Sequence, residues 1–218
     1  MKNKEKLVVL YSGGLDSTVL LKHLIKAGHE VHALVIQYGQ KHDIELGYAD
    51  TFLNENEIEF TNSDFDVHYY PPNDKAVVMA DEMTVENPVV PGRNAIFLSA
   101  AAAYAVRLGY DAVVLGANKD DAELFPDCRK EFIAMMHQAL TSAYGIGVAA
   151  PMIEMTKKEI WEYALQLGID PAKTWSCYDP QPTNSKVWGT PKHKPCEKCL
   201  PCRQREEAKN NNGEANDQ

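Results

Sequence analysis

A glycine-containing turn joins an apolar segment to an amphipathic one near the start of the chain. Residues 7–28 have the sequence LVVLYSGGLDSTVLLKHLIKAG, in which residues 7–11 are apolar or aromatic and residues 17–27 have helical periodicity before Gly28. A strand that passes through such a turn directly into a helix aims several backbone N–H groups, and the positive end of the helix dipole, at one point. We therefore predict that the turn at residues 12–17 binds an anion.

The residue types in this turn suit a phosphate. Gly13 and Gly14 let the backbone approach a ligand without interference from a Cβ atom. Asp16 is too close to a phosphate to bind it directly, so we expect it to hold the turn or a Mg²⁺ ion. The alternative is a simple helix start, in which Asp16 or Ser17 caps the helix. Neither the lysine-bearing G-x-x-x-x-G-K-[ST] loop nor G-x-G-x-x-G occurs in the sequence. Nearby hydroxyl groups could add hydrogen-bond donors: Ser12, Ser17 and Thr18.

Strand and helix patterns alternate along the rest of the chain. Residues 31–37 and 112–115 are short and rich in Val and Leu, as strands buried on both faces are. Residues 93–108 and 156–167 are helical patterns that end before a glycine, and the second opens with the capping box TKKE. This alternation predicts an α/β fold, with a parallel sheet flanked by helices on both faces.

Composition divides the chain into three parts. We expect an α/β domain over residues 1–170, a segment rich in Pro, Lys and Cys over residues 171–206, and a disordered tail over residues 207–218. Residues 61–92 are polar, contain prolines and lack periodicity, so we predict a mobile connection or lid there.

Length and charge narrow the class of protein. The 218 residues are enough for one sizeable core. With 22 Lys+Arg against 31 Asp+Glu the formal net charge is −9, and the absence of a dense basic run argues against a nucleic-acid partner. No apolar run approaches the roughly 20 residues that a bilayer requires, and the apolar run near the N-terminus is too short for a signal peptide. We expect a soluble cytoplasmic protein with a small-molecule substrate and no membrane partner.

The cysteines indicate a metal site. In a reducing compartment, Cys-x-x-Cys spacing is typical of metal binding rather than of disulfides. Four thiolates close a tetrahedral Zn²⁺ site of the structural type, which can order a segment without a core of its own. An iron–sulfur cluster, or His193 in place of Cys177, is the alternative. Cys128 is left over, and we expect it to be a small buried residue at a helix start. The four candidate ligands are Cys177, Cys196, Cys199 and Cys202.

Several motifs together point to a family. Ser-Gly-Gly-x-Asp-Ser after an apolar strand resembles the pyrophosphate loop of the ATP-pyrophosphatase superfamily, whose members adenylate a substrate oxygen and release pyrophosphate. Three further stretches lie beside predicted strands, where α/β proteins collect ligands: QYGQKHDIE (37–45), VPGRNAIFLSAAAAYA (90–105) and GANKDDAELFPDCRKEF (116–132). With TKKEI, SCY and PCEKCLPCRQR, in this order, the chain resembles the 7-cyano-7-deazaguanine synthase family from Leu7 to about Arg205.

The resemblance implies a Rossmann-like α/β fold of the adenine nucleotide alpha hydrolase-like type and a homodimer with one structural Zn²⁺ per subunit, held by the four cysteines above. It also implies the synthesis of a nitrile, 7-cyano-7-deazaguanine, from 7-carboxy-7-deazaguanine, ammonia and ATP with Mg²⁺. The nucleotide loop would comprise Tyr11, Ser12, Gly13, Gly14, Leu15, Asp16, Ser17, Thr18, Val19, Leu20 and Leu21.

We assign roles to the remaining motif residues as hypotheses. The planar guanidinium of Arg93 suits a phosphate or the substrate carboxylate. Asp121 and Asp127 would accept hydrogen bonds from the guanine-like edge of the base, and Lys41 or His42 would neutralise the leaving phosphate. The predicted catalytic residues are Asp16, Ser17, His42, Arg93 and Asp121. The predicted substrate-binding residues are Tyr38, Gln40, Lys41, Arg93, Asn94, Asp121, Asp127 and Arg129.

The sequence departs from the family pattern after GANKDD. Glu123 stands where a serine is usual, Phe125 stands where a tyrosine is usual, and the connection from Cys177 to Cys196 is longer. These differences leave the ATP chemistry intact but leave the product open. The alternatives are an enzyme that stops at the amide or passes the acyl group to another amine, a tRNA-thiolating or tRNA-lysidine-type enzyme, and a zinc module that senses adenine nucleotide without catalysis. The net charge of −9 counts against the tRNA enzymes.

Overall fold

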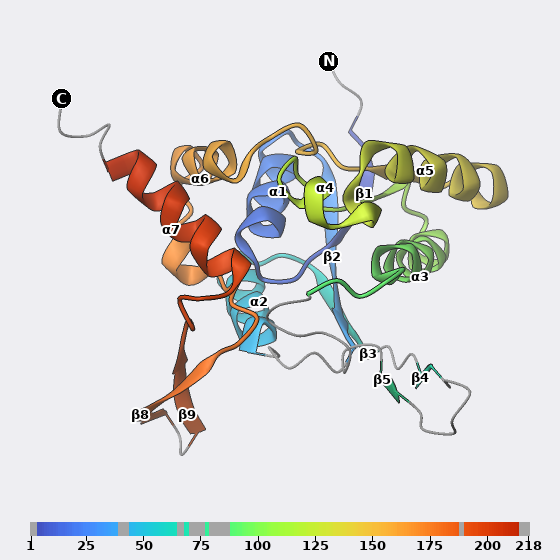
Figure 1. The fold of residues 1–218 in the computed structure, drawn as a ribbon. Coiled ribbons are helices and arrows are strands. Elements are labelled where there is room, and N and C mark those ends of the chain that lie inside the picture. The colour runs from blue at the N-terminus through green and yellow to red at the C-terminus, as the bar shows by residue number, and fades with distance from the viewer. Residues whose placement is uncertain are drawn as a thin grey trace.

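A parallel five-stranded sheet organises the chain (Figure 1). The structure is a computed structural model and describes residues 4–38, 44–64, 68–69, 77–78, 88–187 and 190–213. The strand order is β3-β2-β1-β6-β7, and every neighbouring pair runs parallel. The strands are β1 (Lys6–Leu10), β2 (Glu30–Gln37), β3 (Phe60–Asp64), β6 (Ala112–Val114) and β7 (Gly147–Ala149). The predicted α/β fold is confirmed.

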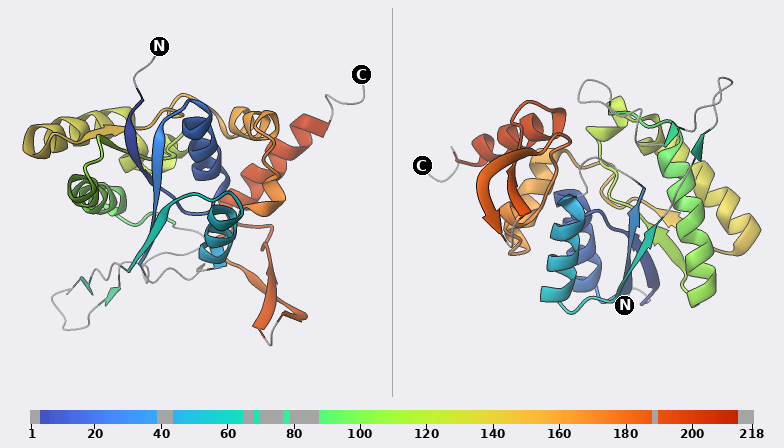
Figure 2. Two further views of the ribbon diagram at one scale, coloured as in Figure 1. Left: turned by 180° about the vertical axis from the view of Figure 1, so that it is seen from behind. Right: turned by 90° about the horizontal axis from the view of Figure 1, so that it is seen from below.

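Alternating residues of the central strands supply two separate cores. Val9 of β1 packs in a core with α1 (Leu15–Lys26), α2 (Ile44–Glu55) and α6 (Lys157–Gln166), whereas Val8 packs on the opposite face with α3 (Arg93–Leu108) and α5 (Lys130–Tyr144). Both valines are fully buried. Side chains of a strand point to alternate faces, so a strand covered by helices on both sides must be apolar throughout. Figure 2 shows the two groups of helices on opposite sides of the sheet.

The strand order predicts where a ligand binds to the sheet. From β1 the chain continues to β2 and β3 on one side, and it then crosses to β6 and β7 on the other side of β1. In such sheets ligands bind beyond the carboxyl ends of the strands where the order reverses, which here is between β1 and β6. The glycine turn lies there, because it follows β1 directly.

The predicted helices are confirmed, and their ends behave as expected. The helix predicted over residues 93–108 is α3, which ends at Gly109 with a left-handed φ of 71°. The helix predicted over residues 156–167 is α6. Its capping box is present, since the Glu159 amide donates to Thr156 Oγ1 at 3.2 Å and the Thr156 amide donates to Glu159 Oε2 at 2.7 Å.

The segment expected to be an irregular connection begins differently from the prediction. The segment 61–92 begins with strand β3 rather than with a connection, because FTNSD pairs with β2 at the sheet edge although it is polar. Most of the rest of the expected lid lies outside the described residues. Two further pairs of strands form small antiparallel sheets outside the main sheet: β4 (His68–Tyr69) with β5 (Val77–Val78), and β8 (Gln181–Val187) with β9 (Thr190–Lys194). The β8–β9 hairpin accounts for the long connection between Cys177 and Cys196.

The C-terminal tail is shorter than predicted. Helix α7 spans Leu200–Gly213, so residues 207–213 are helical and not disordered, while residues 214–218 lie outside the described part. The prediction failed because this part of the chain is mostly polar, although it forms a helix that packs through few apolar residues. One of them is Ala208, which is 4% exposed and lies in the same core as α6. None of the helices in the described part of the chain has both the length and the apolar character needed to cross a membrane.

Candidate active site

The N-terminus of α1 has no side-chain cap. Its N-cap residue is Gly14, and neither Asp16 nor Ser17 caps it, which argues against the simple helix start. Ser17 Oγ instead donates to the Gly14 carbonyl oxygen at 3.1 Å and lies 3.2 Å from Ser12 Oγ. The first N–H groups of a helix have no partner within the helix. With no side chain capping them, these groups and the helix dipole remain available to an anion.

Gly13 serves the packing of the loop rather than an open approach to a ligand. Gly13 has a φ of +80°, and a Cβ atom there would lie 2.6 Å from the Glu45 carbonyl oxygen and 2.9 Å from the Ala49 nitrogen. A Cβ atom on Gly14 would lie 3.4 Å from the Trp175 carbonyl oxygen. We expected the missing Cβ atoms to make room for a ligand, but at Gly13 they make room for α2.

A lysine from another element faces this loop. Lys157 Nζ lies 2.5 Å from Asp16 Oδ2 and 3.2 Å from Asp121 Oδ1, although Asp16 and Lys157 are 141 residues apart in sequence. Asn118 Nδ2 donates to Asp121 Oδ2 at 2.6 Å. Burial raises the pKa of Asp121 to about 6, and the Asp16 carboxylate adds to this while Lys157 opposes it. Although burial lowers the pKa of Lys157, the two carboxylates raise it above its ordinary value, so the lysine is charged.

Lys157 was not predicted as a site residue, because the pattern TKKE predicts a capping box and nothing more. One signal could have found it. Lys157 is the first residue of α6, and a cation at a helix N-terminus is unfavourable toward the helix dipole. Arg93 occupies the same position in α3, next to Gly92. A cation at such a position is therefore a candidate for a specific role, such as pairing with a carboxylate or binding an anion.

Two cavities adjoin the loop and share part of their walls. The first, which we call the strand-end cavity, has a volume of about 230 Å³ and lies at the ends of β1, β2 and β6 between Leu34, Ile36 and Phe97. The second, which we call the α6–α7 cavity, has a volume of about 150 Å³ and is lined by Lys157 and Trp161. The residues that line both are Ser12, Asp16, Ser17, Glu45, Asp121 and Tyr178.

The four described residues predicted for catalysis, Asp16, Ser17, Arg93 and Asp121, all line the strand-end cavity. Arg93 lines it and donates from Nη1 to the Tyr38 hydroxyl at 3.4 Å. Asn94 also lines it, and its backbone N–H donates to Asp127 Oδ2 at 3.0 Å. Asp127 lines neither cavity, so it positions Asn94. Arg129 is exposed, lines neither cavity and donates to the Ala122 carbonyl oxygen.

The last three residues of the predicted nucleotide loop lie beyond the first turn of α1. Val19, Leu20 and Leu21 are fully buried in the apolar core that α1 shares with α2 and α6, so their side chains do not line either cavity. Thr18 is also fully buried, and its hydroxyl donates to the Gly14 carbonyl oxygen at 2.8 Å, so it adds no donor for a ligand. Tyr11 and Leu15 each line one cavity. Gln40, Lys41 and His42 lie outside the described residues.

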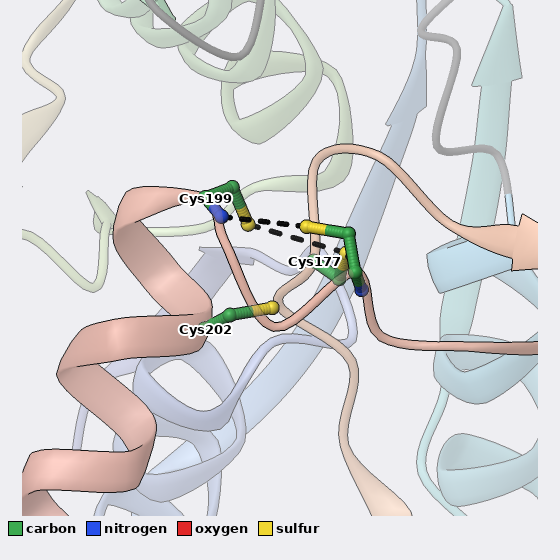
Figure 3. A group of neighbouring side chains, drawn as sticks. Cys177, Cys199 and Cys202 are labelled. Atoms are coloured by element: carbon green, nitrogen blue, oxygen red, sulfur yellow. Dashed lines mark hydrogen bonds between the residues drawn. The ribbon is translucent and has the colours of Figure 1, made fainter.

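Four cysteines converge near the start of α7. Their sulfur atoms all lie within 4.8 Å of one another, which fits one tetrahedral metal ion. The thiols of Cys177, Cys199 and Cys202 point toward one another in Figure 3. In the described part of the chain this group consists of four cysteines and does not include His193, so Cys177 is the fourth candidate ligand. The four residues are Cys177, Cys196, Cys199 and Cys202.

Backbone N–H groups point at these sulfur atoms, as expected for thiolates. The Cys196 amide donates to Cys177 Sγ at 3.2 Å, and the Cys199 amide donates to Cys196 Sγ at 3.3 Å. Against the opposing effect of burial, the amides of Lys198 and Cys199 lower the pKa of Cys196 to about 7. Cys128 differs, because it is 7% exposed at the end of a short 3₁₀ helix (Pro126–Cys128) and burial raises the pKa of its thiol to about 12. This confirms the prediction of a small buried residue.

Comparisons with known proteins identify the family. The model of the family described as "Queuosine biosynthesis protein QueC" matches residues 6–213. The chain is 35% identical to the 7-cyano-7-deazaguanine synthase of Archaeoglobus fulgidus, over 93% of this chain and 85% of that protein. It is 38% identical to that of Thermoplasma acidophilum, over 80% and 79%. The solved structure of the U34-tRNA thiolase NcsA from Methanococcus maripaludis has a TM-score of 0.55 at 18% identity, and covers 99% of this chain and 68% of the thiolase, which supports the fold alone. With the family match spanning nearly the whole described chain, the protein belongs to the QueC family of queuosine biosynthesis proteins.

Proposed function

We propose that this protein is an ATP-dependent enzyme that converts 7-carboxy-7-deazaguanine and ammonia to 7-cyano-7-deazaguanine. The observation that carries the proposal is the uncapped N-terminus of α1, which faces Lys157 and lies beside Arg93 in a member of the QueC family. The names of the curated relatives support the same reaction.

The reaction proceeds through two activations. A carboxylate is a poor electrophile because oxide is a poor leaving group. An oxygen of the carboxylate attacks the α-phosphorus of ATP, so that a new P–O bond forms and pyrophosphate leaves. Ammonia then attacks the acyl carbon, and AMP leaves with the electrons of the C–O bond. A second ATP activates the oxygen of the resulting amide in the same way, and loss of that oxygen with AMP, together with the nitrogen-bound protons, gives the nitrile.

The two adjoining cavities suit two purine-like substrates. Each offers aromatic walls for a flat ring: Phe97 in the strand-end cavity, and Trp161 and Trp175 in the α6–α7 cavity. Both open onto the same loop, so a nucleotide in one cavity and an acid in the other would meet at Asp16 and Asp121.

The charged residues supply electrostatic stabilisation. The N–H groups of the loop and the ammonium of Lys157 would stabilise the charge that develops on the leaving pyrophosphate. The carboxylates of Asp16 and Asp121 are oxygen donors of the kind that suits the Mg²⁺ ion carried by ATP. Arg93 would bind a phosphate or the acid substrate. Enclosure of the adenylate would protect it from water.

We further propose that the four cysteines hold a structural Zn²⁺ ion, because four thiolates leave no open coordination position. Residues 171–206 then form a zinc-held segment docked on the α/β domain of residues 1–170. A reducing compartment keeps such thiols available to a metal, which supports a cytoplasmic location. We propose a homodimer from the family resemblance, and analytical ultracentrifugation tests it.

Purified protein with ATP, Mg²⁺, ammonium and 7-carboxy-7-deazaguanine should yield the nitrile, detected by mass spectrometry of the base together with pyrophosphate release. We expect Arg93→Ala to lower kcat/KM by about 100-fold, since it removes a charge-assisted contact. Arg107→Ala is the matched control, because Arg107 is exposed at the other end of α3. Equal turnover in both variants would remove the role of Arg93, and absence of pyrophosphate release would remove the proposed reaction.

An enzyme that stops at the amide remains a second candidate for a structural reason. Phe125, which stands where the family usually has a tyrosine, lines the α6–α7 cavity and is 6% exposed, so the change removes a hydroxyl from a cavity wall. Glu123, the other substitution, is exposed. Accumulation of the amide as the end product in the same assay would favour this candidate, and Phe125→Tyr should then restore the nitrile.

A further inference from the structure

A short segment connects the four-cysteine cluster directly to the anion-binding loop. Residues 174–178, which we call the strap, run past the loop and end beside the cluster. The Trp175 backbone N–H donates to the Gly13 carbonyl oxygen at 3.1 Å. The candidate metal ligand Cys177 follows two residues later, and Tyr178, which lines both cavities, follows that.

The side chain of Trp175 binds the cysteine side of the same junction. Its indole Nε1 donates to the Cys177 carbonyl oxygen at 3.0 Å. Its ring packs against Tyr48 with a centroid distance of 5.4 Å, and it is 5% exposed in one apolar cluster with Cys177 and Cys199. One residue therefore holds the loop with its backbone and the cysteine segment with its side chain.

The second cysteine-bearing element holds the strap from the other side. The guanidinium of Arg205, on α7, donates to Thr174 Oγ1 at 3.0 Å and to Ser176 Oγ at 3.3 Å. Arg205 lies in the helical turn that follows Cys202. The position of the strap thus depends on how the segment of Cys177 and the start of α7 are held together.

A metal ion bound by the four cysteines would stabilise the contact between the segment of Cys177 and the start of α7 more than the other interactions around it. Ligation by four thiolates stabilises a site by roughly 10–16 kcal/mol, whereas a single backbone hydrogen bond contributes only about 1 kcal/mol net. The buried part of the apolar cluster around the cysteines is small, comprising Trp175, Cys177 and Cys199. Loss of the metal should therefore release the strap, and with it the hydrogen bond to Gly13.

We propose that metal occupancy of the four-cysteine cluster sets the conformation of the anion-binding loop through Trp175, so that this tryptophan is a positioning residue for the reaction. The inference rests on the proposed function, since it takes the loop as the binding site for ATP. It adds a regulatory consequence: removal of the metal, or oxidation of the thiols, weakens nucleotide binding while the parallel sheet remains folded.

Hydrogen–deuterium exchange tests the coupling without reference to turnover. The full chain loaded with Zn²⁺ is compared with the same protein after chelation. We expect faster exchange in the strap and in residues 12–18, and unchanged exchange in β1 and β6. If chelation exposes the cysteine segments but leaves exchange in residues 12–18 unchanged, the proposal is wrong.

Nucleotide affinity supplies the second readout, measured by calorimetry with ATP as its Mg²⁺ complex. Chelation should raise the Kd for ATP by about 10-fold, the equivalent of the one or two hydrogen bonds lost. By linkage, saturating ATP should tighten Zn²⁺ binding by the same factor in a competition with a chelator. A merely structural metal would change stability without this reciprocity, and its absence overturns the proposal.

Trp175→Phe keeps a ring beside Tyr48 but removes the indole donor to the Cys177 carbonyl oxygen. We expect it to weaken Zn²⁺ and ATP binding together, and a loss of Zn²⁺ affinity alone contradicts the coupling. Lys209→Ala is the control, since the Lys209 side chain is exposed on α7 two turns beyond Cys202 and should affect neither affinity. If the loaded wild-type protein fails to bind ATP, the proposed function fails, while the exchange experiment still decides whether the cluster controls the loop.

Discussion

Replacing Gly13 with alanine should damage the loop for two separable physical reasons. Gly13 has a φ of +80°, in the left-handed region that disfavours residues with a Cβ atom. The added Cβ would also lie 2.6 Å from the Glu45 carbonyl oxygen and 2.9 Å from the Ala49 nitrogen. Both neighbours are backbone atoms of α2, so the contact can be relieved only if the helix or the loop moves.

Gly28→Ala separates these two effects. Gly28 has a similar φ of +89°, but a Cβ atom there would have no neighbour within 4 Å. The left-handed backbone should cost each variant about 1–2 kcal/mol. The collision with α2 should add about 1–3 kcal/mol for Gly13→Ala alone. We therefore expect the free energy of unfolding to fall by about 1–2 kcal/mol for Gly28→Ala and by about 2–5 kcal/mol for Gly13→Ala.

Urea unfolding followed by circular dichroism measures these free energies, and calorimetry with Mg²⁺-ATP measures binding. ATP affinity should fall only in Gly13→Ala, because only there must the N–H groups of the loop change position. Equal losses of stability in the two variants would refute the packing argument. A larger loss in Gly13→Ala with unchanged ATP affinity would refute the link between loop geometry and binding.

Three further predictions concern the charged site and the cysteines. Lys157→Met should lower the unfolding free energy by about 2–4 kcal/mol and lower kcat/KM by about 100-fold, because it leaves the carboxylates of Asp16 and Asp121 without a cation. The control is Lys158→Met, which removes an exposed ion pair with Glu162 (3.9 Å) and should change stability by less than about 1 kcal/mol. Equal losses in the two variants would contradict the role of Lys157 in the charged site. The pKa of Asp121 is raised to about 6, which means that the folded protein favours the protonated carboxyl. The resulting contribution to the free energy of unfolding is fully present below about pH 4 and is lost as the pH rises through 6. Relative to Asp121→Asn, the wild-type protein should therefore lose up to about 3 kcal/mol between pH 4 and 7 in urea titrations, whereas a pH-independent difference would show that the carboxyl titrates normally. Cys199→Ala should lose bound metal in elemental analysis while Cys128→Ala retains it, because Cys199 belongs to the four-cysteine cluster and Cys128 does not; retention in Cys199→Ala would rule out this site.

Local patterns in the sequence were sufficient for the main elements of the fold. The strand at residues 31–37 and the helix at residues 93–108 could be predicted because burial on two faces, helical periodicity and a terminal glycine are properties of adjacent residues. The cysteine motif was equally local, since three of its members share one turn and the start of α7. The edge strand β3 and the end of α7 were missed because their polar residues carry no such pattern.

The arrangement of the site depended on contacts between residues far apart in the chain. Asp16 could be predicted in the loop, but only the tertiary structure places Lys157 against it. Gly13 could be predicted too, but the reason for that glycine lies in the backbone of α2. Cys177 could be predicted as a ligand, but the hydrogen bond from Trp175 to the loop depends on how the strap packs. Periodicity and turn chemistry act over a few residues and are written in the sequence, whereas these pairings are set by how the sheet and its two helical layers pack together.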